Sequence, residues 1–224
     1  MAITVNQVIS ILSERAGKPF DIPFQEELKV IADYWISSIL KQVLEKRPQD
    51  RYRFQVSFVL ELERVPEIEC PIEYGCVLRT KQQLPKPSRG GGDTLFDYIG
   101  SADFRDPWNR AIPTAFMDIM ASEPIVGKRP KPSYRNDYIY VYGHDAKEVK
   151  YIGVKGVFTD FSKLRELQCK EGGSCFEEDI PYPVTEDIIQ QAIQAILSTE
   201  LRLQPLLEDT EVEATIPQPL NKRK

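Results

Sequence analysis

Prolines and glycines crowd one stretch of the chain, between Pro85 and Pro132, and this stretch limits which folds are possible. It holds seven of the 17 prolines and the triplet Gly90–Gly92. Proline fixes φ and has no N–H to donate, so neither a continuous helix nor a central strand can run through the whole stretch. We therefore expect extended loop arms within residues 82–133, carrying at most one short helix near Thr114–Met120.

Apolar residues at helical spacing predict two helices before this stretch. The first begins after an N-cap at Thr4 and ends near Gly17, and the second follows Pro23 and ends near Pro48. The apolar stripes are Val5, Val8, Ile9 and Leu12 in the first helix, and Phe24, Leu28, Ile31, Trp35, Ile39 and Val43 in the second. Tyr34, Ile36, Leu40 and Leu44 widen the apolar surface of the second helix, so we expect it to contact material on two sides, one of which could be another subunit.

Two further helical segments are expected near the C-terminus. A short one covers Phe161–Leu167, and the last helix begins after an N-cap at Thr185, where acidic residues favour the positive end of the helix dipole. The predicted buried stripe of the last helix is Ile189, Ala192, Ile193, Ile196, Leu197 and Leu201. Beyond Pro205 we expect an extended tail.

Alternating apolar residues predict the strands. The alternation is clearest in Phe54–Leu62, and a second strand is expected over Cys76–Thr80. The aromatic run Tyr138–Tyr142 and the segment Val149–Phe158 are expected to form a hairpin around a turn at Gly143–Asp145. Five of the ten tyrosines lie between Tyr134 and Tyr151. Cross-strand aromatic pairing explains this run better than a nucleic-acid stacking platform, which remains the alternative.

These elements predict an α+β fold. A small antiparallel sheet packs with the long N-terminal helix and the C-terminal helix, and long proline-rich loop arms extend from it. We expect residues 1–203 to form a single α+β domain and residues 204–224 to form the extended C-terminal tail. The chain of 224 residues has ample material for one core, with 42% hydrophobic residues.

Several classes of protein are disfavoured by composition and motifs. No apolar run reaches the roughly 18 residues of a spanning helix, and the first 17 residues lack a signal-peptide pattern, so we expect folding in a cytoplasm and no membrane. His144 is the only histidine, which disfavours histidine triads and histidine-based zinc sites. Phosphate-binding and nucleophile-elbow motifs are absent, and Gly90–Gly92 predicts a flexible turn. We therefore expect no enzyme, no catalytic residues and no cofactor.

Charge is distributed unevenly around the formal net charge of -5. Residues 79–136 carry ten basic and six acidic side chains, a sum of +4, whereas residues 161–213 carry four basic and twelve acidic ones, a sum of -8. Two segments of opposite charge suit a subunit that packs against copies of itself. The alternative is a solvated acidic face.

The four cysteines form two pairs with the same spacing, Cys70 with Cys76 and Cys169 with Cys175. Structural zinc prefers two to four residues between paired ligands, so five intervening residues weaken the case for a four-thiolate zinc site. A cytoplasmic origin favours free thiols, although a particle that leaves the cell could acquire a disulfide within each pair. Free thiols, two disulfides and a zinc site in a soluble regulatory module therefore remain open.

Several segments together resemble a structural protein of the crAss-like tailed bacteriophages. They are spread from about residue 10 to about residue 205. The segments are Leu12–Asp21, Phe24–Glu26, Tyr34–Trp35, Glu45–Lys46, Val77–Lys81, Pro85–Arg89, Phe96–Asp103, Tyr138–Tyr142 and Pro181–Val184. The resemblance carries no catalytic, cofactor-binding or metal-binding residue to this chain.

The resemblance implies a ring or adaptor protein beneath the portal, in the head-to-tail connector of a short-tailed phage. Such a protein is assembled in the host cytoplasm into the virion, as a homo-oligomeric ring of about twelve copies. Its implied partners are the portal protein and other tail or ring proteins. The ring would extend the channel through which DNA passes during ejection, and an acidic protein suits a channel that binds DNA neither tightly nor specifically.

Overall fold

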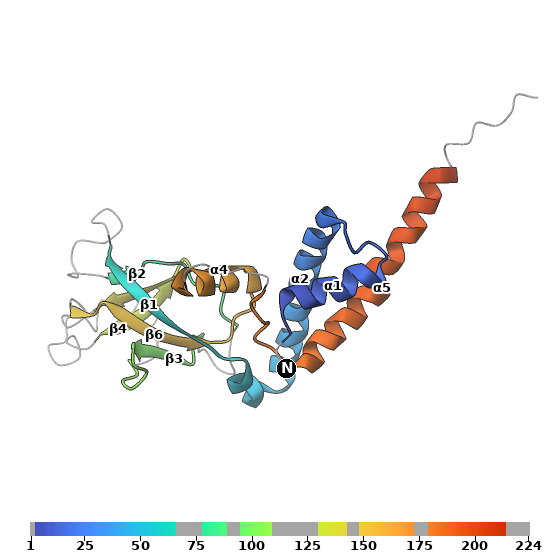
Figure 1. The fold of residues 1–224 in the computed structure, drawn as a ribbon. Helices are drawn as coiled ribbons and strands as arrows, with labels where there is room; N and C mark the ends of the chain where they lie inside the picture. The colour runs from blue at the N-terminus through green and yellow to red at the C-terminus, as the bar shows by residue number, and fades with distance from the viewer. Residues whose placement is uncertain are drawn as a thin grey trace, which may run out of the picture.

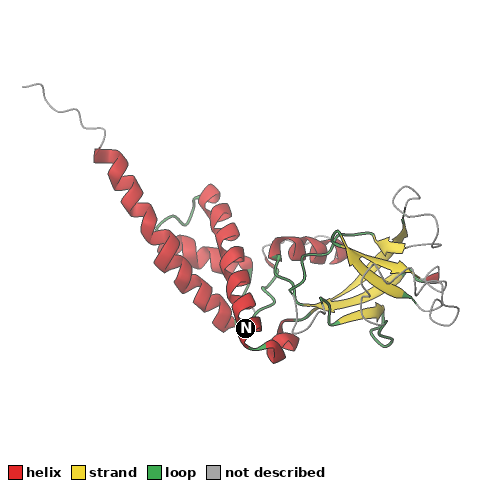
Figure 2. Cartoon of the chain, turned by 180° about the vertical axis from the view of Figure 1, so that it is seen from behind, coloured by secondary structure: helices red, strands yellow, loops and turns green. Residues whose placement is uncertain are grey.

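The computed structural model describes residues 3–65, 78–88, 95–108, 130–142, 148–172 and 179–213. Their elements gather in two lobes (Figure 1). The helical lobe contains α1 (Val5–Arg15), α2 (Ile22–Lys46) and α5 (Glu186–Glu213). The sheet lobe contains six strands and α4 (Phe161–Gly172), and the view from behind shows the same division (Figure 2). The predicted α+β fold is confirmed.

The two N-terminal helices begin at side-chain caps. The Thr4 hydroxyl accepts a hydrogen bond from the Gln7 N–H, and the Gln7 side chain accepts one from the Thr4 N–H, which makes a capping box. The Asp21 carboxylate accepts from the Phe24 N–H at the start of α2. Gly17 follows α1 with a φ of +72°, a backbone conformation that glycine adopts without strain. The predicted limits of α1 are confirmed.

From Ile31 onward, the most buried residues of α2 lie one position later in the sequence than the predicted stripe. Its most buried members are Phe24, Leu28, Ala32, Ile36, Ser37, Leu40 and Leu44. Ile31, Trp35, Ile39 and Val43 are only partly buried, although they pack against the same core. Tyr34, which was expected to widen the apolar surface of this helix, is 68% exposed in the single chain, and the expected contact with another subunit on that side stays a prediction. Alanine and serine are only weakly indicative of burial, so the sequence pattern did not predict that Ala32 and Ser37 belong to the buried face of α2.

The sheet is antiparallel throughout, in the order β3-β6-β1-β2-β5-β4. The strands are β1 (Val56–Arg64), β2 (Leu78–Thr80), β3 (Tyr98–Ser101), β4 (Lys131–Arg135), β5 (Tyr138–Tyr142) and β6 (Tyr151–Gly156). β1 is central, pairing with β6 over its first part and with β2 near its end. The predicted alternation is confirmed in β1. The strand begins two residues later than expected, because Phe54 is the last residue of the short helix η1 (Pro48–Phe54).

The predicted hairpin between Tyr138–Tyr142 and Val149–Phe158 is wrong. β5 pairs with β4 and β2, whereas β6 pairs with β1 and β3. The true hairpin joins β4 to β5 through Asn136 and Asp137, whose φ angles of 51° and 64° are those of a tight turn with both central residues left-handed. β3 and β4 were not predicted, since β3 lies inside the segment 82–133 that was expected to form loop arms and β4 begins inside it. The helix expected at Thr114–Met120 lies outside the described residues.

In the register of β4 with β5, the residues directly opposite the tyrosines of β5 are not aromatic. Their partners in register are Arg135 for Tyr138, Ser133 for Tyr140 and Lys131 for Tyr142. The predicted cross-strand aromatic pairing is therefore wrong for β5. Ile139 and Val141 alternate with these tyrosines and are fully buried, so β5 presents one apolar and one aromatic face.

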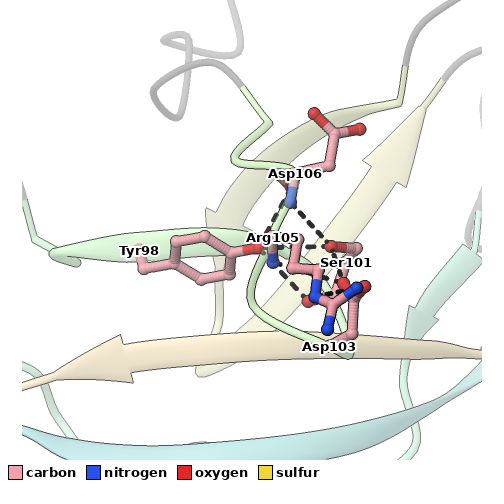
Figure 3. Close-up of polar contacts among 5 residues, drawn as sticks. All are labelled: Tyr98, Ser101, Asp103, Arg105 and Asp106. Atoms are coloured by element: carbon pink, nitrogen blue, oxygen red, sulfur yellow. Dashed lines mark hydrogen bonds and ion pairs between the residues drawn. The ribbon is translucent and has the colours of Figure 1, made fainter.

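A tight turn follows β3, and hydrogen bonds hold its shape (Figure 3). The Tyr98 hydroxyl lies 3.2 Å from the Ser101 carbonyl oxygen and 3.0 Å from that of Asp106. The Ser101 hydroxyl donates to the Asp103 carboxylate and accepts from the Asp106 N–H at 2.9 Å. The Ser101 hydroxyl, followed by the Arg105 N–H, lowers the pKa of Asp103. The turn therefore has a fixed conformation at the edge of the sheet.

The two C-terminal helices are longer than the sequence predicted. α4 continues beyond Leu167 to Gly172, and α5 passes through Pro205 and ends at Glu213. The expected extended tail is therefore wrong for residues 204–213, while 214–224 lie outside the described residues. In both views the end of α5 projects beyond the other helices (Figures 1 and 2). None of the helices within the described ranges is long and apolar enough to cross a membrane.

The buried apolar residues form one cluster that runs through both lobes. Ile36 is fully buried in it, whereas Val30, six residues earlier on α2, is 70% exposed. Replacing Ile36 with Ala is expected to lower the free energy of unfolding by about 2–5 kcal/mol, because it leaves a cavity. The matched change Val30→Ala is expected to cost less than about 0.5 kcal/mol. Denaturant unfolding measures both, and equal losses would contradict the orientation of α2.

Candidate interaction surfaces

The cysteines, His144 and the glycine triplet do not form a described site. Cys70, Cys76, Cys175, His144 and Gly90–Gly92 lie outside the described residues. Cys169, on α4, is disulfide-bonded, and its partner lies outside the described part of the chain. The expectation of a free thiol is therefore wrong for Cys169. Nowhere in the described ranges do three or more histidine, cysteine, aspartate or glutamate side chains gather closely enough to hold a metal ion.

An ion pair joins the two lobes. Arg165 of α4 donates two hydrogen bonds to the Asp33 carboxylate of α2, at 3.1 and 2.6 Å. The Tyr182 hydroxyl donates a third, at 2.7 Å. The Arg165 side chain is 4% exposed and that of Asp33 18%, so water screens the pair little. Because a buried charge that loses its partner is costly, this contact opposes separation of the lobes.

Tyr182 is central to the same junction. Its ring packs edge-on against Phe161 at 5.4 Å, and its N–H donates to the Ile3 carbonyl. Burial, followed by the adjacent Asp33 carboxylate, raises the pKa of Tyr182 far above the ordinary tyrosine value. Tyr182 therefore contacts α4 and α2 through its side chain, and the segment that leads into α1 through its backbone.

A groove of about 680 Å³ runs along the junction between α2 and the start of α4. One wall is α2 from Glu26 to Lys41, and the other is formed by Lys86 and residues 159–162 with Arg165. The backbone between the walls is fixed, because the Ser37 hydroxyl donates to the Thr159 carbonyl at 2.8 Å. The two walls of the groove are therefore held together and do not belong to parts that move separately.

Exposed apolar side chains line the α2 side of this groove. Val30 is 70% exposed and Tyr34, one turn later, is 68% exposed. Ile22, about two turns before Val30 on α2 and outside the groove lining, is also 70% exposed. Phe20, in the α1–α2 connection, is 94% exposed. We call Ile22, Val30 and Tyr34 the α2 stripe. Such an apolar row on an otherwise polar surface is typical of an interaction site.

The outer face of the sheet offers a second surface, of different chemistry. The register places Val59, Glu61, Glu63, Arg79, Tyr138, Tyr140, Tyr142, Tyr151 and Lys155 on it. Arg79 pairs with Glu63 at 2.9 Å and lies over the Tyr138 ring at 5.0 Å. Lys81 at the adjoining edge pairs with Glu61 at 3.1 Å. Because these charges have both signs, the face is unlike the continuous basic groove of a nucleic-acid platform.

The turn after β3 covers part of this outer face. Phe104 lies over Gly153, where an added Cβ would be 2.9 Å from the Phe104 ring and 2.6 Å from the Ser101 carbonyl oxygen. Lys155 places its ammonium 4.7 Å from the centre of the Phe104 ring. Only glycine at position 153 permits this approach, so the turn is a fixed part of the outer face.

The junction was not predicted from the sequence, and of the α2 stripe only Tyr34 was expected. Asp33 lies within a mostly apolar helix, and a carboxylate there is a weak sign of a buried partner. The partner, Arg165, is 132 residues away, so no local pattern could have identified it. Tyr34 was expected in the apolar surface that the long helix could offer to another subunit, and Val30 was not predicted. The described part of the basic segment 79–136 lies in the sheet lobe, whereas the acidic segment 161–213 is divided between the lobes, with α4 in the sheet lobe and α5 in the helical lobe.

The family model described as phage tail ring protein 2 matches residues 26–218 of the chain. No curated protein matches the chain.

Replacing Tyr182 with Phe keeps the ring on Phe161 but removes the hydrogen bond to Asp33. We expect a loss of about 1.5–3 kcal/mol in the free energy of unfolding, as for hydrogen bonds to charged groups. The raised pKa of Tyr182 gives stability that is complete below about pH 10, the value for unfolded tyrosine, and that falls as pH rises further. The difference in stability between the unaltered protein and Tyr182→Phe should therefore shrink above about pH 10.

The control Tyr151→Phe, at a ring 51% exposed, should change stability little at neutral pH. A loss in Tyr182→Phe no larger than in this control would contradict the junction.

The disulfide at Cys169 gives a chemical test. Without reductant, a thiol reagent should leave Cys169 unmodified in the denatured protein, and it should modify Cys169 after reduction, because only a thiolate reacts. Peptide mass spectrometry identifies the modified residue. Modification of Cys169 before reduction would contradict the disulfide, and bound zinc that appears with it would support the four-thiolate alternative.

Proposed function

Because the chain belongs to the phage tail ring protein 2 family, we propose that it is a structural component of a crAss-like phage virion that forms a homo-oligomeric ring in the head-to-tail connector. The observation that carries the proposal is the family match, which spans residues 26–218. In the proposed ring the chain extends the channel below the portal, offers a docking face to the next tail component and helps to retain packaged DNA. These roles are mechanical and need no catalytic residue.

The two lobes suit a subunit of a closed ring. Rings form by heterologous contacts, in which one patch of a subunit meets a different patch of its neighbour. The apolar α2 stripe and the charged, tyrosine-rich outer sheet face are such different patches. The junction of Asp33, Arg165 and Tyr182 holds the lobes in one relative orientation, which a ring of uniform curvature requires of every copy.

The charge of the chain suits a channel for DNA. Phosphate binding strengthens with each basic contact, so a protein with a net charge of -5 retards passing DNA little. On the outer sheet face, Arg79 and Lys81 are paired with carboxylates, which reduces their attraction for phosphate. We propose a ring of about twelve copies, with the portal protein and other ring proteins as its neighbours.

The zinc-binding module is not supported as a second function. A four-thiolate site needs thiolates at Cys70, Cys76, Cys169 and Cys175, and the disulfide leaves none at Cys169.

Quantitative mass spectrometry of purified phage particles tests the proposed role. The chain is expected at the same number of copies in every particle, comparable to that of the portal protein, because a closed ring has fixed stoichiometry. The major capsid protein is the internal standard, and a host cytoplasmic protein controls for contamination. Absence of the chain from particles, or one copy or fewer per particle, would contradict a ring.

A further inference from the structure

We propose that the end of α5, residues 203–213 of one copy, docks in the groove between α2 and α4 of the next copy. This inference rests on the proposed ring and specifies the contact that closes it. The occupant of the groove is thus a second copy of this chain, and the contact is heterologous, since the groove and the helix end are different parts of the subunit.

The length of the groove matches the length of the helix end. The α2 wall extends from Glu26 to Lys41, which at about 1.5 Å per residue is about 22 Å. Residues 203–213 continue α5 to its end at Glu213, and at the same rise they are about 16 Å long. The helix end is therefore short enough to lie along α2 within the length of the groove.

The two ends of the groove differ in charge. Val30 and Tyr34 are the exposed apolar side chains of its α2 wall, and the charged residues beside Val30, Glu26 and Lys29, have opposite signs. Lys41 lies further along α2, and Lys86 lies beside it, because the Lys86 carbonyl accepts from the Thr159 N–H and Thr159 is bonded to Ser37, one turn before Lys41. Both lysines are exposed. This end of the groove therefore suits a negatively charged partner.

The sequence of the helix end changes from apolar to acidic in the same direction. It carries leucines at 203, 206 and 207, and then Glu208, Asp209, Glu211 and Glu213, with no basic residue among 203–213. If the helix end runs parallel to α2, its leucines come beside Val30 and Tyr34 and its carboxylates beside Lys41 and Lys86. The negative end of the α5 dipole adds to the attraction for the lysines.

The same chain cannot fill its own groove. In both views the end of α5 points away from α4 and from the sheet lobe (Figures 1 and 2). The pairing of this helix end with the groove must therefore be made between subunits. Apolar contacts are expected to supply most of the affinity, and the charges are expected to set the direction of the helix, since exposed ion pairs contribute little.

Zero-length cross-linking of purified particles tests the contact directly. A carbodiimide joins a lysine amine to a carboxylate only where the two touch. We expect cross-linked dimers of this chain in which Lys41 or Lys86 is joined to an acidic residue within 208–213. Lys46, on α2 outside the groove lining, is the internal control and should not form these links.

The outcomes separate this inference from the proposed function. Dimers linked only through other residues would overturn the α5 contact and leave the ring standing. Particles in which the chain is present but gives no cross-linked dimer by any chemistry would overturn both. Links from Lys46 as frequent as those from Lys41 would show unspecific contact and overturn the inference.

A charge exchange tests the pairing in the purified full chain. One variant carries Lys41→Glu and Lys86→Glu, and the other carries Glu208→Lys and Asp209→Lys. Each alone is expected to assemble at least about tenfold more weakly than the unaltered chain, while the mixture should recover assembly, because each helix end then meets a groove of opposite charge. Variants that assemble normally alone, or a mixture that fails to recover, would overturn the pairing. If the unaltered chain stays monomeric in solution, the particle cross-links decide.

The apolar part of the contact has a matched pair of variants. Val30→Asp, in the groove, is expected to weaken assembly at least about tenfold. Val59→Asp places the same change at another exposed valine, 41% exposed on the outer sheet face, and should leave this contact unchanged. Sedimentation and thermal unfolding of both variants separate loss of assembly from loss of folding. Equal assembly by Val30→Asp and the unaltered chain would contradict burial of the α2 stripe.

Discussion

The ion pair between Asp33 and Arg165 fixes the relation between the two lobes. Arg165 donates two hydrogen bonds to the Asp33 carboxylate, and both side chains are little exposed. The Tyr182 hydroxyl donates a third hydrogen bond to the same carboxylate. A buried pair of this kind adds less to net stability than to specificity, because desolvation offsets much of the attraction. Its importance here is geometric. Together with the hydrogen bond from Ser37 to the Thr159 carbonyl, it fixes the separation between the two walls of the groove.

A fixed junction connects the fold to the proposed assembly. Small errors in the angle between two lobes would add up around a ring, so a subunit needs one orientation and not a range of them. The same junction leaves Val30 and Tyr34 exposed at the groove while burying their neighbours on α2. The apolar surface that the monomer leaves uncovered therefore lies next to the contact that makes the monomer rigid.

Local signals in the sequence predicted local structure well. Thr4 and Gln7 are close in sequence and cap α1, and the period-two pattern of β1 is a property of that strand alone. The predicted strand pairing was wrong because it depends on residues far apart in the sequence, and β6 pairs with β1 instead of β5. The turn between β4 and β5 was not predicted because only two residues, Asn136 and Asp137, indicate it. The interaction surfaces depend on Arg165 meeting Asp33, which no local pattern encodes. The family resemblance identified the class of protein, and the family model that matches residues 26–218 agrees with it.

The central claim is that this chain is a repeated building block whose neighbours meet through the α2–α4 groove. Imaging intact particles by electron cryo-microscopy tests it most directly, at a resolution that shows helices. The account predicts a closed ring of identical two-lobed subunits, each with a helix from its neighbour lying along α2. A particle in which this chain lies outside any ring, or a ring whose groove faces empty solvent, would contradict it.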